Sequence, residues 1–163
     1  IEDAGFKSES VGAFGLFDTL EHVEDDEGFL VALRRILKTG GRLFVTLPAF
    51  NVLWSHEDVH AGHFRRYDLS GAASKFRRAG FNINYATYFM MLLPAPVFIF
   101  RSLPYRMGLR KTHPKDRLTK ELSGGSGFAE RLIATTFPYE VRKIKSLGKI
   151  PFGSSLLVAA EKR

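Results

Sequence analysis

Cysteine is absent from this chain of 163 residues, tryptophan occurs once, and no apolar run is long enough to cross a bilayer as a helix. The missing cysteines exclude disulfides and thiolate metal sites, and they favour a reducing, cytoplasmic compartment. No glycine-rich phosphate or nucleoside loop precedes the first apolar run. Residues 1–10 also lack the basic start and apolar centre of a signal peptide.

Apolar residues make up 45% of the chain and include 15 phenylalanines, which is enough for the core of one domain. The net charge of +7 is unevenly divided, because the first 30 residues hold nine acidic residues and one basic residue. This asymmetry predicts an acidic ligand or an anionic surface facing the basic part, with a solvated basic face as the alternative. Since the basic part carries no nucleic-acid-binding motif, we expect no nucleic-acid partner.

A strand–helix–strand unit is the most informative stretch of the sequence. Its elements are a buried strand at Val11–Phe17, a helix at Glu24–Lys38 that Gly40 and Gly41 end, and a strand at Arg42–Leu47 followed by Pro48. In open α/β sheets, ligands bind beyond the carboxyl ends of parallel strands. Asp18, Glu21 and His22 follow the first strand, so we expect them to face a site.

The remainder of the chain predicts further elements of an α/β fold. A loop over the site is expected at Phe50–Tyr67, followed by a helix at Leu69–Ala79 that Asp68 or Ser70 caps and Gly80 ends. A strand at Phe81–Tyr88 leads into an apolar run at Tyr88–Phe100 and then into a basic, later Gly/Ser-rich loop at Arg101–Gly127. The last expected elements are a helix at Gly127–Pro138 and a strand at Ser155–Ala160.

Several segments together resemble the C-terminal part of a class I S-adenosylmethionine-dependent methyltransferase. They are Asp18–Val23 (DTLEHV), Leu33–Gly41 (LRRILKTGG), Phe44–Pro48 (FVTLP), His63–Tyr67 (HFRRY), Arg78–Phe81 (RAGF) and Pro151–Leu157 (PFGSSLL). The resemblance implies a Rossmann-like sheet in the strand order 3-2-1-4-5-7-6, of which residues 1–163 supply strands four to seven with their flanking helices. We therefore expect one truncated methyltransferase domain without its N-terminal cofactor-loop half, and an apolar then basic insertion at 88–127.

The resemblance also implies a function, which is methyl transfer from S-adenosylmethionine to a small-molecule acceptor. It implies cofactor contacts by Phe17 at the end of the fourth strand, with Asp18 and Leu20 beside it. Because the cofactor loop is missing, we expect this chain alone to be inactive. We also expect the fourth strand to expose an edge that favours self-association.

Asp18, Glu21 and His22 stand at i, i+3 and i+4, so one helical turn would place them on one face. Two carboxylates and an imidazole can hold a divalent cation. The pattern resembles the E-x-x-E-H motif of ubiquinone-pathway O-methyltransferases, which implies Mg²⁺. In the alternative interpretation, Glu21 and His22 orient the loop and bond backbone groups.

The segment after the second strand supplies the other candidate residues. We predict that His63 is a base near neutral pH and that it forms the catalytic set with Glu21 and His22. The H-x-D-x-H-x-x-H pattern of His56, Asp58, His60 and His63 could bind zinc, or it could form a hydrogen-bonded surface loop. Arg65, Arg66 and Tyr67 are expected to bind an anionic substrate group or, alternatively, to pair with the acidic helix start; Trp54 is expected to form a substrate wall or to pack internally.

The apolar run at Tyr88–Phe100 precedes a cluster of arginine and lysine residues. Apolar followed by basic sequence is typical of a membrane-surface segment, so we expect peripheral membrane contact and a lipid-like or quinone-like acceptor. A buried core segment or a hydrophobic lid is the alternative. A non-enzymatic methyltransferase-like module that docks on a membrane or a protein partner is the alternative function.

Overall fold

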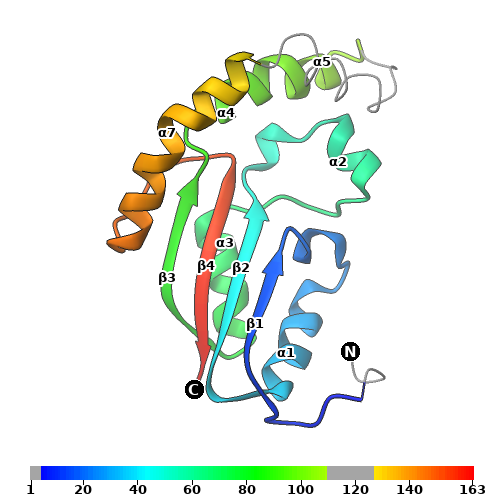
Figure 1. Cartoon of the computed structure of the whole chain (residues 1–163). Coiled ribbons are helices and arrows are strands. Elements are labelled where there is room, and N and C mark those ends of the chain that lie inside the picture. The colour runs from blue at the N-terminus through cyan, green and yellow to red at the C-terminus, as the bar shows by residue number, and fades with distance from the viewer. Residues whose placement is uncertain (1–4, 110–126) are drawn as a thin grey trace.

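Four strands form one mixed sheet in the order β1-β2-β4-β3 (Figure 1). The computed structural model describes residues 5–109 and 127–163, except for the side chains of 127–133. The strands are β1 (Val11–Phe17), β2 (Leu37–Pro48), β3 (Phe81–Phe89) and β4 (Ser155–Lys162). β1 and β2 pair in parallel, and β4 runs antiparallel to both β2 and β3. The predicted arrangement of strands four to seven, in the order 4-5-7-6, is confirmed.

Helices α1 (Asp26–Ile36) and α3 (Leu69–Arg78) contact each other and lie on the same face of the sheet (Figure 1). Each begins at an aspartate whose side chain accepts a backbone hydrogen bond, Asp25 for α1 and Asp68 for α3. The cap of α3 is therefore Asp68 and not Ser70. The core beneath these helices includes Leu30, Leu33, Leu43, Val45, Leu47, Phe76, Leu156 and Val158.

The predicted boundary between the first helix and the second strand is wrong by a few residues. α1 ends at Ile36 and β2 begins directly at Leu37, which is fully buried in the core. Burial of this side chain in the sheet outweighs the helical periodicity that predicted a helix to Lys38. Gly40, which was expected to end the helix, has a left-handed backbone with φ of +77° and lies inside β2 near a register shift against β1.

The segment after β2 is more regular than the predicted loop, because it contains η3 (Asn51–Leu53) and α2 (His56–Ala61). A helix of six residues is too short for apolar periodicity to reveal it. Ser55 and Asp58 form a capping box at its start, and Gly62 ends it with φ of +73°.

Several helical segments lie beyond the upper end of the sheet in Figure 1, and the last of them, α7, runs from there down the left side of the picture. They are α4 (Pro94–Val97), the π-helical turn η4 (Phe98–Ser102), α5 (Leu103–Arg106) and α7 (Gly127–Lys145). The predicted end of the last helix at Pro138 is wrong, because α7 continues to Lys145. Its fully buried Glu140 accepts hydrogen bonds from the backbone N–H groups of Met90 and Met91, at 2.6 and 2.9 Å, and this anchor offsets the hydrogen bond that proline removes.

Most of the predicted basic loop falls on residues 110–126, which lie outside the described residues. Within the described ranges, no helix combines the length and apolar character needed to cross a membrane.

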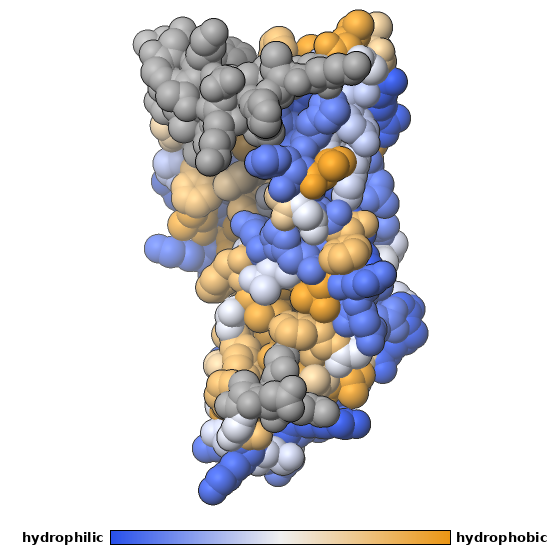
Figure 2. All heavy atoms as spheres, turned by 90° about the vertical axis from the view of Figure 1, so that its right-hand side faces the viewer, coloured by the Kyte–Doolittle hydropathy of each residue, from blue (hydrophilic) through white to orange (hydrophobic). Residues whose placement is uncertain are grey.

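The outer edge of β1 pairs with no strand among the described residues. Exposed apolar side chains accompany it, including Phe6 (51% exposed) and Phe17 (65% exposed). Figure 2 views the molecule from the side on which β1 and α1 lie in Figure 1, and it shows apolar atoms gathered over the lower half of that side. Self-association through this edge stays a prediction.

Candidate functional site

The carboxyl ends of β1 and β2 meet at the upper edge of the sheet, where Asp18 turns the chain out of β1. Asp18 has a left-handed backbone with φ of +47°, and its N–H donates to the carbonyl oxygen of Thr46 in β2 at 3.3 Å. The Thr46 hydroxyl in turn donates to Asp18 Oδ1 at 3.1 Å. This bracing fixes the strand end and leaves the Phe17 ring largely exposed beside it.

Of the three predicted cofactor contacts, Phe17 and Asp18 lie at the exposed strand end. Leu20 is fully buried in the core, so its side chain is not available to a bound molecule. The backbone carbonyl of Leu20 accepts a hydrogen bond from the Tyr67 hydroxyl at 3.3 Å. The sequence missed this because the inward direction of Leu20 depends on η2 (Leu20–His22), a single 3-10 turn.

Glu21, His22 and His63 come together at this edge. One potential metal-ligand atom from each residue lies within 4.8 Å of those of the other two. Among the residues that the structure describes, no other group of three or more histidine or acidic side chains is gathered as closely. The rings of His22 and His63 meet edge to face with centroids 4.7 Å apart. The backbone N–H of Phe64 donates to the Glu21 carbonyl at 2.8 Å, which ties the segment after α2 to η2. The predicted catalytic set is therefore adjacent in space, although the sequence separates its members by some forty residues.

Glu21 is 1% exposed, and its Oε2 atom has no hydrogen-bond partner among the residues that the structure describes. Burial raises the pKa of Glu21, and the nearby Asp18 charge raises it further; the Glu21 backbone N–H and the two histidines act in the opposite direction without cancelling the shift. A buried carboxyl group with an unsatisfied oxygen is costly for stability, and such groups concentrate at functional sites.

His63 is held by Asp58, whose Oδ1 lies 2.9 Å from His63 Nδ1. Arg66 donates to both oxygens of Asp58, from Nε at 2.7 Å and from Nη2 at 3.0 Å. Sequence reasoning placed Asp58 only within a candidate zinc pattern and missed its contact with His63. The signal that could have found it is the Ser-x-x-Asp spacing from Ser55, which predicts a helix start and therefore a fixed carboxylate.

The remaining histidines of that candidate zinc pattern do not join the group. His56 packs edge to face on Tyr105 of α5, with ring centroids 4.7 Å apart, and His60 lies on the exposed side of α2. Of the two interpretations that the sequence left open, a hydrogen-bonded loop is the one the described residues favour.

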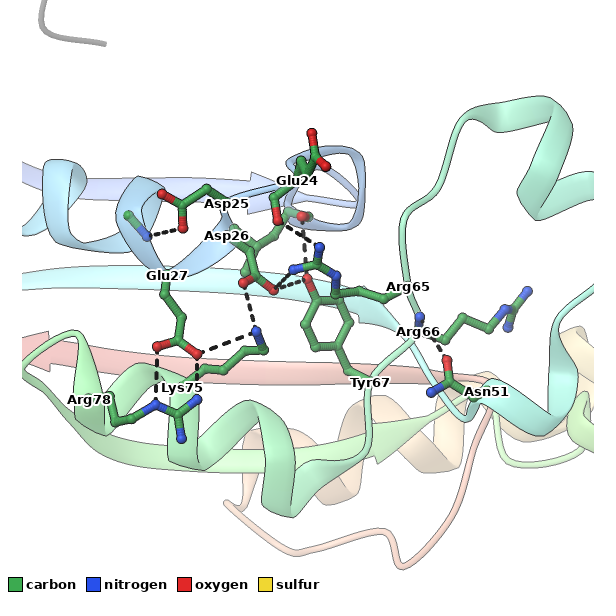
Figure 3. A network of polar contacts seen from close by, with 12 residues as sticks. Glu24, Asp25, Asp26, Glu27, Asn51, Arg65, Arg66, Tyr67, Lys75 and Arg78 are labelled. Carbon is green, nitrogen blue, oxygen red and sulfur yellow. Dashed lines mark hydrogen bonds and ion pairs between the residues drawn. The ribbon is translucent and has the colours of Figure 1, made fainter.

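The predicted substrate-binding residues Arg65, Arg66 and Tyr67 direct their polar atoms into the protein. Figure 3 shows Arg65 and Tyr67 pointing at Asp26, while the Arg66 guanidinium points away from it. Arg65 Nη1 lies 2.8 Å from Asp26 Oδ2, and the Tyr67 hydroxyl donates to the same oxygen at 2.9 Å. Pairing with the acidic helix start, the alternative left open by the sequence, is the arrangement observed for Arg65.

Asp26 is 2% exposed and also binds Lys75 of α3, 2.7 Å away. Burial alone would raise its pKa, but the hydrogen bonds from Lys75, Arg65 and Tyr67 together lower it. Burial and the bond to Asp26 raise the pKa of Tyr67, so its hydroxyl stays protonated and donates. Trp54 is partly buried, which leaves both packing and a substrate wall open to it.

The expected magnesium ligands do not assemble. The Asp18 carboxylate is bonded to Thr46 and is not part of the group that Glu21, His22 and His63 form. Magnesium prefers oxygen ligands in an octahedral shell, whereas this group offers one carboxylate and two imidazoles, a set more typical of transition metals. The residues present therefore do not fit a magnesium ion, and we derive no step through one.

A comparison with family models finds one described as a methyltransferase domain, which matches residues 1–45. None of the curated proteins compared matches the chain.

Solved structures similar to this chain include three methyltransferases. One is the complex of the Haloferax volcanii Trm112 methyltransferase activator with a methyltransferase (TM-score 0.54, 14% identity, 96% of this chain and 56% of that chain). A second is a SAM-dependent methyltransferase from Thermotoga maritima (TM-score 0.52, 17% identity, 98% of this chain and 59% of that chain). A third is geranyl diphosphate methyltransferase in complex with SAM (TM-score 0.54, 13% identity, 98% of this chain and 54% of that chain). The chain thus spans little more than half the length of these structures, and at such identities the likeness establishes the fold alone.

Proposed function

We propose, on the premise that this chain has part of the Rossmann-like class I methyltransferase fold, that the protein transfers a methyl group from S-adenosylmethionine to a small-molecule acceptor. The observation that carries the proposal is the position of Glu21, His22 and His63 where β1 and β2 end. Ligands of open α/β sheets bind at that edge, so the chemistry-bearing residues lie where a cofactor and an acceptor would meet.

S-adenosylmethionine, when bound, supplies an electrophilic methyl group on a sulfonium leaving group. The exposed Phe17 ring offers an apolar surface to such a molecule, and the braced Asp18 carboxylate beside it is a hydrogen-bond acceptor. These residues fit one side of a nucleoside site. Because the chain spans little more than half of its structural relatives, we expect turnover only from the protein in its full natural length.

His63 is proposed as the group that takes the proton from the acceptor. A bond forms between the acceptor's nucleophilic atom and the methyl carbon, the methyl–sulfur bond breaks, and the acceptor proton passes to His63 Nε2. The Glu21 carboxylate stabilises the imidazolium that results, and the His22 ring limits the orientation of His63. The protein otherwise orients the two reactants and excludes water.

The acceptor is proposed to have a large apolar portion, as a lipid or a quinone has. Exposed apolar side chains lie on the segments that surround the upper end of the sheet: Val52, Val59 and Phe64 after β2, and Ile99, Phe100 and Leu103 in η4 and α5. These two groups of segments touch, because Arg106 donates to the Val52 carbonyl at 3.3 Å. Arg101 and Arg106 add positive charge, which would suit an acceptor located at an anionic membrane surface.

The test is a transfer assay that uses the protein in its full natural length, S-adenosylmethionine labelled on the methyl carbon, and a small-molecule extract separated into organic and aqueous phases. We expect label in the organic phase, and we expect His63→Gln to lower the rate at least 100-fold, because general-base catalysis contributes about 10²–10⁴-fold. His60→Gln is the matched control, since His60 is an exposed histidine three residues earlier, and it should retain the wild-type rate.

Transfer of label to aqueous products alone would contradict the apolar acceptor but not the methyl transfer. No transfer at all, with folded protein and a varied extract, would contradict the enzymatic function and favour a non-enzymatic binding module.

A further inference from the structure

His63 is folded back onto Asp58 by the way α2 ends. Gly62 adopts a left-handed backbone with φ of +73°, and the N–H of His63 then donates to the backbone carbonyl of Asp58 at 2.9 Å. The same reversal sets His63 Nδ1 against Asp58 Oδ1, at 2.9 Å. The backbone and the side chain of Asp58 therefore both contact His63, which fixes the position of the imidazole relative to α2.

Asp58 is itself held on all sides, and it is 1% exposed. The Arg66 guanidinium approaches both carboxylate oxygens, a two-point arrangement that fixes direction as well as distance. The Ser55 N–H donates to Oδ2 at 2.9 Å. Arg66 is anchored in turn by the carbonyl oxygen of Ala49, 3.2 Å from Nη1, just after β2. The carboxylate is thus tied to the sheet.

These contacts decide which nitrogen of His63 carries the proton. Burial alone would raise the pKa of Asp58, but the hydrogen bonds and charge of Arg66, together with His63 and Ser55, lower it. Asp58 is therefore a carboxylate at neutral pH and only accepts hydrogen bonds. Nδ1 must then be the protonated nitrogen of neutral His63, which leaves the lone pair on Nε2.

We propose that Asp58 is a positioning residue that holds His63 in the Nδ1-protonated tautomer, so that Nε2 receives the acceptor proton, and that Arg66 locks Asp58 for this role. The proposal rests on the proposed methyl transfer. It assigns the carboxylate–imidazole arrangement of Asp58 and His63 the same task that such a pair performs in hydrolases, where the carboxylate orients the imidazole and stabilises the imidazolium. His63 contacts the acceptor, whereas Asp58 acts only through His63.

A purely structural role for Asp58 is the competing explanation, because Asp58 also belongs to the capping box of α2. The two explanations differ in one observable, the tautomer of His63. Asp58→Asn keeps the shape of the side chain. With its oxygen toward Ser55 and Arg66 Nη2, its amide nitrogen faces His63 Nδ1 and favours the Nε2-protonated tautomer, at the cost of the hydrogen bond from Arg66 Nε.

The first experiment uses the protein in its full natural length with ¹⁵N-labelled histidine and assigns the His63 ring nitrogens by NMR, with His63→Gln to identify the signals. We expect the wild type to be protonated at Nδ1 and Asp58→Asn to be protonated mainly at Nε2. An Nε2-protonated wild type would overturn the proposal without any need for a variant at Asp58.

The second experiment measures methyl transfer with the protein in its full natural length. Asp58→Asn should lower kcat about 100-fold or more, by analogy with the loss that a wrong tautomer causes in hydrolases, while KM for S-adenosylmethionine stays within about twofold. Asp68→Asn makes the same change at the aspartate cap of α3 and should leave kcat unchanged.

Each outcome is decisive. If Asp58→Asn folds and retains kcat, or if Asp68→Asn loses as much activity, Asp58 is not a positioning residue. If the wild-type protein transfers no methyl group, the proposed function fails, and the NMR result still reports separately whether Asp58 sets the tautomer.

Discussion

Nη1 of Arg65 lies 2.8 Å from Oδ2 of Asp26, and this ion pair joins the segment after α2 to the first turn of α1. Lys75 of α3 reaches the other oxygen of Asp26, also from within 3 Å. Figure 3 shows the buried carboxylate between cations from two separate segments. Because Arg65 and its neighbour Arg66 follow His63 after a single residue, this network and the Asp58 contacts together fix the segment that carries the proposed base.

Replacement of Asp26 by asparagine should destabilise the protein by roughly 3 kcal/mol. Removing one member of a buried ion pair leaves the others without compensation, and two cations and the Tyr67 hydroxyl depend on this carboxylate. Urea unfolding measures the change. The matched control is Asp25→Asn next to it, an exposed helix cap that should cost about 1 kcal/mol or less. Equal losses from the two variants would contradict a special role for Asp26.

Stability should fall steeply below about pH 4, the pKa range of aspartate in an unfolded chain. Asp26 and Asp58 have pKa values lowered by their partners in the folded protein, so their contribution is complete above the unfolded value and is lost as pH falls through the folded value. Urea unfolding between pH 2 and pH 7 measures this dependence. In Asp26→Asn the acid slope should be shallower than in the wild type, and an unchanged slope would exclude Asp26 as a cause.

Glu21→Gln should stabilise the protein at pH 7, by roughly 1 kcal/mol or about 2–4 °C in Tm. The folded-state pKa of Glu21 is raised by burial, so the wild type loses stability as pH rises through that value. Glutamine carries no charge to bury, and so the gain should vanish near pH 4. Thermal unfolding at both pH values measures it, with the exposed Glu24→Gln as control. A Glu21→Gln variant less stable than the wild type at pH 7 would show that Glu21 has a partner.

Chelation of magnesium should leave methyl transfer within about twofold of the untreated rate. The reason is that Asp18 bonds Thr46, and the group of Glu21, His22 and His63 offers too few oxygens for this ion. The assay compares EDTA-treated protein with and without added Mg²⁺. Loss of activity on chelation that Mg²⁺ restores would support the magnesium site that the sequence motif implied.

The parts of the site that follow a strand directly could be predicted, as could the set of Glu21, His22 and His63, but the hydrogen-bond partners of the side chains around them could not. Phe17 and Asp18 were placed correctly at the strand end, because a buried apolar run defines where a strand stops. Leu20 was assigned to the cofactor, but a single 3-10 turn directs it into the core. Arg66 was assigned to the substrate as one alternative, yet its guanidinium is occupied by Asp58 and Ala49. The sequence could not separate these two roles of Arg66, because an arginine that binds a substrate and one that binds an internal carboxylate look the same in a sequence.

The sequence by itself determined the order of the strands and helices, the parallel pairing of β1 with β2 and the position of a polar site beyond them, because apolar periodicity and helix caps are local properties. Only the tertiary structure decided that Asp18 stays outside the group that His63 forms with Glu21 and His22, and that Asp58 contacts His63. The physical reason is that these contacts depend on side-chain direction after turns such as Gly62, where one backbone angle redirects all that follows.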